Sequence, residues 1–182
     1  MTELAKLRDD GLFENYFCGI PMLQLWSDLR IWENLLNLTP VKGMLELGTA
    51  SGGLTTFLAL QCHFRGIPFA TSDHVRSTHL ARFPVPIEHF SGDMWSDIIG
   101  SKIHAMLDKP ENHPFLLFCD GGDKPREFRT FAPWLHSGDI IGVHDVGNVQ
   151  EFQAKDIEPV ANLVQKLQLT DSFTETWFFR RV

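Results

Sequence analysis

The chain has 182 residues, of which 43% are hydrophobic and 21% charged, a balance typical of a single globular domain. The formal net charge of −7 argues against a nucleic-acid-binding surface, which would be basic. No apolar run approaches the roughly 20 residues of a membrane-spanning helix, and the first ten residues are too charged for a signal peptide. Cys18, Cys62 and Cys119 show neither metal spacing nor a paired framework, so we expect a cytoplasmic protein.

The predicted elements alternate between helices and strands. Leu25, Leu29, Trp32 and Leu36 recur at helical spacing, which predicts an amphipathic helix over Met22–Leu38. Further along the chain we expect strands over 43–47, 69–72, 87–92, 114–119, 139–144 and 173–179, and helices over 54–64, 96–107, 125–135 and 149–167.

This alternation predicts an α/β domain whose mostly parallel central sheet has six to seven strands and helices on both faces. We expect one domain over 1–182, with an N-terminal helical segment over 1–40 and the core over 41–182. Sheets of this kind bind ligands beyond the carboxyl ends of their strands.

The end of the first core strand carries a glycine-rich loop, Glu46-Leu-Gly48-Thr-Ala-Ser-Gly52-Gly53. The dinucleotide pattern G-x-G-x-x-G is absent, because the glycine after Gly48 comes four residues later. The phosphate loop is absent too, since no Gly-Lys-Ser/Thr follows. The remaining pattern, E-x-G-x-x-x-G-G, resembles the first motif of class I S-adenosylmethionine-dependent methyltransferases. The resemblance implies that this loop wraps the amino-acid end of the cofactor.

The ends of the second and third strands carry further polar residues. Asp73 follows the second strand, where a carboxylate can accept both hydrogen bonds of a ribose diol; the alternative is a solvated turn residue. His74 lies beside it. The resemblance implies that Asp93 and Met94, at the third strand end, contact the adenine.

The fourth and fifth strands end in Asp120 and in the pair His144-Asp145. If these two strands are adjacent, their ends converge, because neighbouring strands lie about 4.8 Å apart. Two carboxylates and an imidazole suit a divalent metal. The alternative is that Asp120 caps the next helix and His144 only packs. Asp123 and Lys124 are candidates for a general base, with His144 as the alternative.

The span from Gln24 to Gly147 resembles the cephalosporin-hydroxylase-like and rhamnosyl O-methyltransferase group of small-molecule methyltransferases. The resemblance rests on Gln24, on "MLELGTASGGLTTFLA" and on "FCDGGDKPREFRTFAPWLHSGDIIGVHD". It implies a Rossmann-like fold and a Mg²⁺-type ion held by Asp120, His144 and Asp145, although an acid is more usual at His144. It also implies a cofactor site made of Glu46, Gly48, Thr49, Ala50, Ser51, Gly52, Asp73, His74, Asp93, Met94 and Asp120.

The closing segment, "SFTETWFFRRV", leaves little room for the β-hairpin that ends the sheet in this group. We therefore expect the substrate to be bound partly by a second subunit of a homo-oligomer.

The leading hypothesis is an S-adenosylmethionine-dependent O-methyltransferase that acts on a small hydroxylated molecule, a sugar or a natural product, with the help of Mg²⁺ or another divalent metal. A second hypothesis is a metal-independent enzyme with His144 as the base. A third is a cofactor-binding protein without turnover. The glycine spacing counts against a dehydrogenase.

Overall fold

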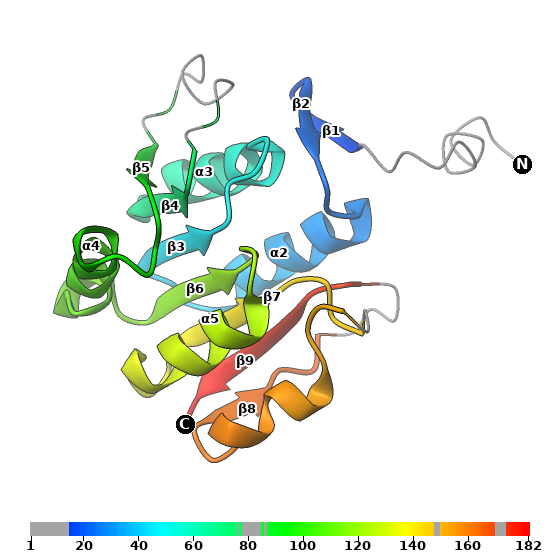
Figure 1. Ribbon diagram of the computed structural model, residues 1–182. Helices are drawn as coiled ribbons and strands as arrows, with labels where there is room; N and C mark the ends of the chain where they lie inside the picture. The colour runs from blue at the N-terminus through cyan, green and yellow to red at the C-terminus, as the bar shows by residue number, and fades with distance from the viewer. Residues whose placement is uncertain (1–14, 76, 78–84, 86, 148–149, 170–173) are drawn as a thin grey trace, which may run out of the picture.

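The computed structural model describes residues 15–75, 77, 85, 87–147, 150–169 and 174–182. Most of the strands in this part of the chain form one seven-stranded sheet of order β5-β4-β3-β6-β7-β9-β8 (Figure 1). The first five of these are parallel neighbours, and β9 runs antiparallel to both β7 and β8. The predicted α/β sheet is therefore confirmed. The strands are β3 (Gly43–Leu47), β4 (Phe69–Asp73), β5 (Glu88–Ser91), β6 (Phe115–Cys119), β7 (Ile140–Val143), β8 (Val164–Lys166) and β9 (Trp177–Arg181).

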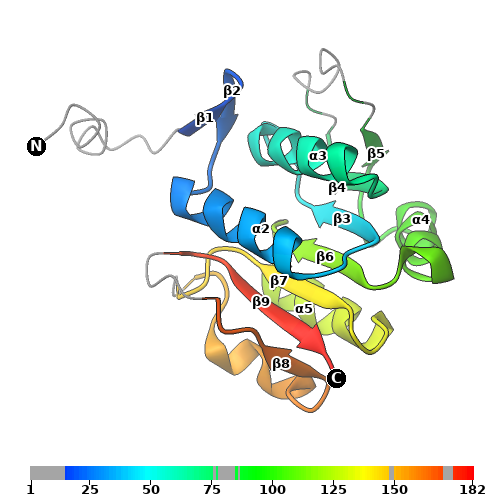
Figure 2. The ribbon, with the colours of Figure 1, turned by 180° about the vertical axis from the view of Figure 1, so that it is seen from behind.

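Helices cover both faces of the sheet (Figures 1 and 2). On the first face, α2 and α3 pack against Leu116 and Phe118 of β6. On the second, α4 and α5 pack against Phe115, Leu117 and Cys119. Because successive side chains of a strand point to opposite faces, β6 is buried along its whole length and reads as a continuous apolar run. The helices are α2 (Trp26–Leu38), α3 (Gly53–Arg65), α4 (Asp97–Leu107) and α5 (Lys124–Phe131), with short 3₁₀ turns η2 (Pro110–Asn112) and η3 (Ala132–Trp134).

None of the helices in the described residues is long and apolar enough to cross a membrane.

Trp32 of α2 anchors the first face of the sheet. Its side chain is fully buried, and its ring meets the rings of Phe118 and Phe178 edge-on, each at a centroid distance of 4.7 Å. A side chain at Gly142 of β7 would overlap the rings of Phe118 and Phe178. The glycine in this strand therefore makes room for the aromatic cluster.

The helix predicted over Met22–Leu38 is confirmed over Trp26–Leu38. Ahead of it, β1 (Asn15–Phe17) and β2 (Ile20–Met22) form a two-stranded hairpin. The helix begins after Leu25 because the Asp28 carboxylate accepts a hydrogen bond from the Leu25 N–H, at 3.1 Å. Residues 1–14, the first part of the predicted helical segment 1–40, lie outside the described residues.

The helix predicted over 149–167 is wrong where the structure describes it. The chain forms 3₁₀ turns η4 (Ala154–Asp156) and η5 (Glu158–Val160) and then strand β8. Phe152, Val160 and Val164 pack into the second face of the core, so their helix-like spacing reflects burial along an irregular path. Pro159 lacks a backbone N–H and cannot continue an α-helix.

Strand β8 also corrects the expectation of a sheet without its closing hairpin. Val164–Lys166 pairs antiparallel with the last part of β9, and β9 pairs in turn with β7. The predicted closing strand begins at Trp177 and runs to Arg181. The antiparallel pair β8–β9 therefore completes the sheet.

We expect Trp32→Ala to lower the free energy of unfolding by about 3–5 kcal/mol, the cost of emptying a buried aromatic site. Trp26→Ala is the matched control, because the Trp26 side chain is 57% exposed, and it should change stability by less than about 0.5 kcal/mol. Denaturant unfolding of both variants measures the difference. Equal losses in the two variants would contradict the central role of Trp32.

Candidate active site

Backbone hydrogen bonds from the residues that follow the central strands extend the sheet by one residue beyond the strand ends. These bonds align the carboxyl ends of the strands side by side. The Gly48 N–H donates to the Ser72 carbonyl at 2.8 Å, and the Asp120 N–H donates to the Leu47 carbonyl at 2.8 Å. The His144 N–H donates to the Cys119 carbonyl at 3.1 Å. Asp120 and His144 therefore follow adjacent strands, as the sequence predicts if β6 and β7 are neighbours.

The glycine-rich loop between β3 and α3 lies directly against the end of β6. Gly48 has a φ of +98°, and any side chain at this position would collide with the backbone of Asp120 and Gly121. Only glycine combines this backbone conformation with so close an approach. The loop and the β6 end therefore form one continuous wall.

Asp73, at the end of β4, braces the same loop. Its Oδ2 accepts hydrogen bonds from the Thr49 N–H at 2.9 Å and from the Ala50 N–H at 2.8 Å. Ala50 has a φ of +46°, an uncommon value for a residue with a side chain. One oxygen of Asp73, predicted as a ribose ligand, is thus used to hold the loop in shape.

Glu46 lies beneath the loop and is 1% exposed. Its Oε2 accepts hydrogen bonds from the hydroxyls of Thr55 at 2.6 Å and Thr71 at 2.7 Å. Its Oε1 is buried without a hydrogen-bond partner among the described residues. Burial raises the pKa of Glu46 to about 8, with the two threonine hydrogen bonds opposing the rise. The carboxyl group is therefore largely protonated at neutral pH.

Asp120, His144, Asp145 and Lys124 form the polar cluster at the ends of β6 and β7. The Nδ1 atom of His144 lies 3.3 Å from Asp120 Oδ1 and 3.2 Å from Asp145 Oδ1. The Lys124 ammonium lies 2.8 Å from Asp145 Oδ2 and 3.9 Å from Asp120 Oδ1. Glu151 extends the cluster, 3.3 Å from the same ammonium. One ligand atom each from Asp120, His144 and Asp145 lies within 4.8 Å of the others.

The charges of this cluster depend on one another. Burial opposes charging of the His144 ring, but the neighbouring Asp120 and Asp145 carboxylates raise its pKa to about 10. The hydrogen bond from His144 holds the pKa of Asp145 well below its usual range, whereas burial raises the pKa of Asp120. A positive charge on the imidazole thus compensates the two carboxylates. A divalent cation could provide the same compensation, so the donor set fits a metal.

Two side chains, one just before α2 and one in its first turn, support the cluster. Gln24, just before the helix, donates from Nε2 to Asp120 Oδ2 at 2.5 Å. Asp28 is fully buried, and its Oδ2 lies 4.0 Å from His144 Nε2. Gln24 enters the sequence analysis only through the resemblance, and Asp28 is missed there. The signal at Asp28 is local: an acid in the first turn of a predicted helix is typical of a helix cap and does not point to His144.

Glu127 is a second residue that the sequence analysis misses. It is 1% exposed, and its carboxyl oxygens accept hydrogen bonds from the Gly121 N–H at 3.2 Å and the Asp123 N–H at 3.3 Å. Burial raises its pKa to about 7. Glu127 therefore fixes the turn that follows Asp120, in the same way that Asp73 fixes the glycine-rich loop.

Two adjoining pockets open along this row. The smaller, of about 140 Å³, is lined by the glycine-rich loop, by residues 21–24 and by the polar cluster. The larger, of about 440 Å³, lies on the side of β4 and β5 and is lined partly by Met94 and Trp95. Both pockets share Gly48, Ala50 and Asp120. Of the predicted residues, Glu46, Thr49, Ser51, Gly52, Lys124, His144 and Asp145 line the smaller pocket, and Asp73, His74 and Met94 line the larger.

Asp93 is the one predicted cofactor residue that lines neither of these two pockets. Its side chain is exposed, and its Oδ1 accepts a hydrogen bond from the Trp95 N–H at 3.0 Å. Asp93 thus shapes the turn that presents Met94 and Trp95 to the larger pocket.

No protein-family profile matches the chain, and no curated relative matches it. Solved structures do. A structure of CmcI with Mg and SAM superposes with a TM-score of 0.69 at 17% identity, over 92% of this chain and 76% of that one. TomG, an O-methyltransferase from Streptomyces achromogenes involved in tomaymycin synthesis, was solved with SAM. It superposes with a TM-score of 0.54 at 20% identity, over 86% of this chain and 79% of that one.

MycE, a methyltransferase of the mycinamycin biosynthetic pathway solved with Mg and SAH, gives a TM-score of 0.56 at 13% identity, over 85% of this chain and 48% of that one. At these identities the similarity is one of fold. The chain therefore has the Rossmann-like fold of class I methyltransferases, as the glycine-rich loop predicts.

The raised pKa of Glu46 predicts a stability that depends on pH. Between the usual pKa near 4.5 and the folded-state value of about 8, the folded protein binds a proton that the unfolded chain releases. This contribution to the free energy of unfolding therefore falls as pH rises, by up to about 1.4 kcal/mol per pH unit.

Glu46→Gln should remove this dependence, because a neutral amide replaces the protonated acid. Denaturant unfolding at pH 5.5, 6.5 and 7.5 should show the wild type losing stability relative to the variant at each step. A constant difference between the two proteins across this range would contradict the assignment.

Proposed function

We propose that this protein is an S-adenosylmethionine-dependent O-methyltransferase that acts on a small hydroxylated molecule, a sugar or a natural product, with a divalent cation at its active site. The observation that supports this most directly is that Asp120 lines both pockets and also belongs to the polar cluster. A methyl donor and a metal-held acceptor would thus meet at one residue. The three similar structures named above carry SAM or SAH, two of them with Mg.

The two pockets fit the two ends of the cofactor. Loop residues Thr49–Gly52 line the smaller pocket, where their polar backbone would contact the amino-acid end. The larger pocket would take the nucleoside, with Met94 and Trp95 against the base. Asp73 lines this pocket with one carboxylate oxygen engaged by the loop, and the other would accept a hydrogen bond from the ribose.

Asp120, His144 and Asp145 would hold the cation. When bound, it would act as a Lewis acid that lowers the pKa of the acceptor hydroxyl and orients the hydroxyl toward the methyl donor. Gln24 would hold Asp120 through the hydrogen bond between Nε2 and Oδ2. Asp28 would orient the His144 ring from its Nε2 side, leaving Nδ1 directed at the two carboxylates.

We assign the role of general base to Lys124 among the candidate bases. Burial favours its neutral amine, but the hydrogen bond to Asp145 and the charges of Asp120, Asp145 and Glu151 outweigh burial and raise the pKa of Lys124 above its ordinary value in the metal-free site. Once the two aspartates share their charge with a cation, burial should prevail and the amine could accept the hydroxyl proton. His144 would then serve as a ligand, and the metal-independent route with His144 as the base is the less favoured alternative.

The acceptor would lie against the segment that joins β2 to α2. Residues 21–24 line the smaller pocket together with the polar cluster, and Leu23 is 63% exposed. The prediction of a second subunit at the substrate site rests on a short closing segment and on the few residues left for a substrate lid, and a homo-oligomer stays a prediction. Because β8 and β9 pair, we assign the acceptor contacts to this chain.

Binding of S-adenosylhomocysteine should stabilise the protein. At a hundredfold excess over Kd, ligand binding adds about 2.7 kcal/mol to the free energy of unfolding. A thermal-shift titration, with and without Mg²⁺, measures the effect. Absence of any shift would refute both the enzyme and the binding protein without turnover.

Asp120→Asn should leave the S-adenosylhomocysteine shift largely intact and reduce methyl transfer by at least about a hundredfold, because it removes a charge needed for a cation. Release of S-adenosylhomocysteine across a panel of sugars and phenols provides the assay. Asp108→Asn is the matched control, since Asp108 is exposed at the end of α4. A wild-type rate that survives EDTA would instead favour the metal-independent enzyme. Cofactor binding without transfer to any acceptor would favour a protein without turnover.

A further inference from the structure

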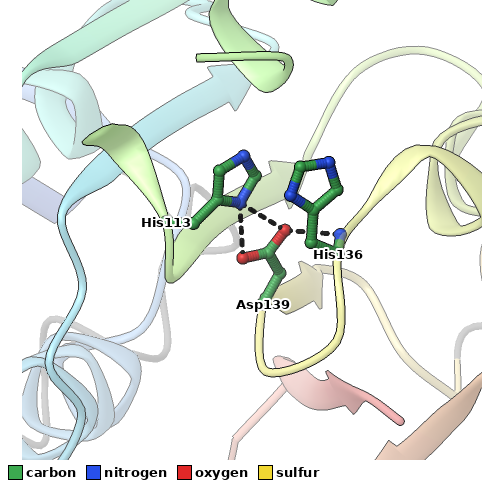
Figure 3. Close-up of side chains that lie close together, drawn as sticks. All are labelled: His113, His136 and Asp139. Atoms are coloured by element: carbon green, nitrogen blue, oxygen red, sulfur yellow. Dashed lines mark hydrogen bonds and ion pairs between the residues drawn. The ribbon is translucent and has the colours of Figure 1, made fainter. Parts of the chain in front are cut away.

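A second cluster of metal-binding side chains lies at the opposite edge of the sheet. His113 precedes β6, and His136 and Asp139 precede β7, so all three gather at the amino ends of the strands (Figure 3). One ligand atom from each lies within 4.8 Å of the others. The two pockets described above open at the carboxyl ends of the same strands, so this cluster is separate from the proposed active site.

Asp139 is the residue of the cluster that the surrounding backbone holds most firmly. Its side chain is fully buried, and its two oxygens accept hydrogen bonds from the backbone N–H groups of Phe115 and His136, each at 2.7 Å. Its backbone carbonyl accepts a further bond from the Arg181 N–H at 2.8 Å. The carboxylate is therefore held in place by the start of β6 and by the turn before β7, and the Asp139 backbone is held by the end of β9, before any metal binds.

His113 has the arrangement of a metal-ligating histidine. Its Nε2 lies 2.7 Å from the Leu107 carbonyl, which can only accept, so Nε2 carries a proton. Its Nδ1 faces the Asp139 carboxylate, 2.8 and 2.9 Å from the two oxygens. A lone pair on Nδ1 would repel these oxygens, so at these distances a proton lies between them. A histidine whose other nitrogen donates to a carbonyl is the usual form of a metal ligand.

His136 completes the set from the solvent side. Its ring is exposed and stacks on the His113 ring, at a centroid distance of 3.9 Å and an angle of 16° (Figure 3). A metal lies in the plane of each ring that binds it, so the stacked pair must open for both to bind one ion. Because the His136 side chain faces solvent, it can rotate without disturbing the core.

We propose that His113, His136 and Asp139 form a binding site for one Zn²⁺-type transition-metal ion. Two imidazoles and one carboxylate suit Zn²⁺, whereas Mg²⁺ prefers oxygen ligands. The fourth position would be open to water, since His136 is at the surface. The ion would replace the proton between His113 and Asp139 and tie the start of β6 to the turn before β7. This site lies outside the proposed methyltransferase function and does not depend on it.

Zn²⁺ titration by calorimetry tests the site on protein first stripped of metal with a chelator. The wild type should bind Zn²⁺, and His136→Ala should lose at least about tenfold in affinity for this site, since loss of even a supporting residue costs that much. His63→Ala, which alters another exposed histidine, should bind like the wild type. Asp145→Asn should also retain this site, because only the other cluster contains Asp145.

Thermal unfolding gives a second measurement on the same proteins. Without metal, His136→Ala should unfold at the wild-type temperature, and added Zn²⁺ should raise the melting temperature of the wild type and of His63→Ala much more than that of His136→Ala. Equal Zn²⁺ affinity in His136→Ala and the wild type would overturn the proposal. So would Zn²⁺ binding that only Asp145→Asn weakens, or no Zn²⁺ binding at all, which would leave a proton between His113 and Asp139.

Discussion

The parallel pairing of β6 with β3 on one side and β7 on the other is the constraint on which the rest of the structure depends. The ladder continues one residue past each strand, through the bonds from Asp120 to Leu47 and from His144 to Cys119. The side chains of Asp120 and His144 therefore start from neighbouring positions. The close approach of Gly48 to the Asp120 backbone brings the glycine-rich loop against the same row of strand ends. The pockets exist because three loops leave one sheet edge together.

The candidate active site also brings together several ionisable groups whose charged forms are disfavoured by burial. Glu46 and Glu127 respond by holding a proton more tightly, with pKa values raised to about 8 and about 7. Asp120 and Asp145 instead share a positive partner in His144. Such groups destabilise a domain unless they are paired, so their concentration at one edge of an otherwise apolar core is a mark of function. Asp73 and Glu127 hold the two loops beside these groups through hydrogen bonds to backbone N–H groups.

Most of the fold follows from local patterns, and the exceptions have physical causes. Strands β3, β6 and β7 are predictable because each is a short, mostly apolar run bounded by glycine, proline or charge. The more polar β4 and β5 are predictable from their place in the alternation of strands and helices. Residues 20–22 join a hairpin because their partners lie at 15–17, which helical periodicity does not reveal. The spacing of Phe152, Val160 and Val164 imitates a helix, yet Pro159 interrupts it, and the strand that follows is specified by its pairing with β9.

By itself the sequence determined the class of sheet, the glycine-rich loop and the presence of Asp120 and His144-Asp145 at strand ends, since these depend on spacing along the chain. Only the tertiary structure decided which groups meet. Asp28 lies 116 positions before the histidine it approaches, and Asp93, predicted at the cofactor, accepts a hydrogen bond from the Trp95 N–H in a turn. His113 and Asp139 are 26 positions apart and meet because β6 and β7 are adjacent. Contacts of this kind depend on strand order and register. Long-range packing determines both, and the local sequence pattern does not predict them.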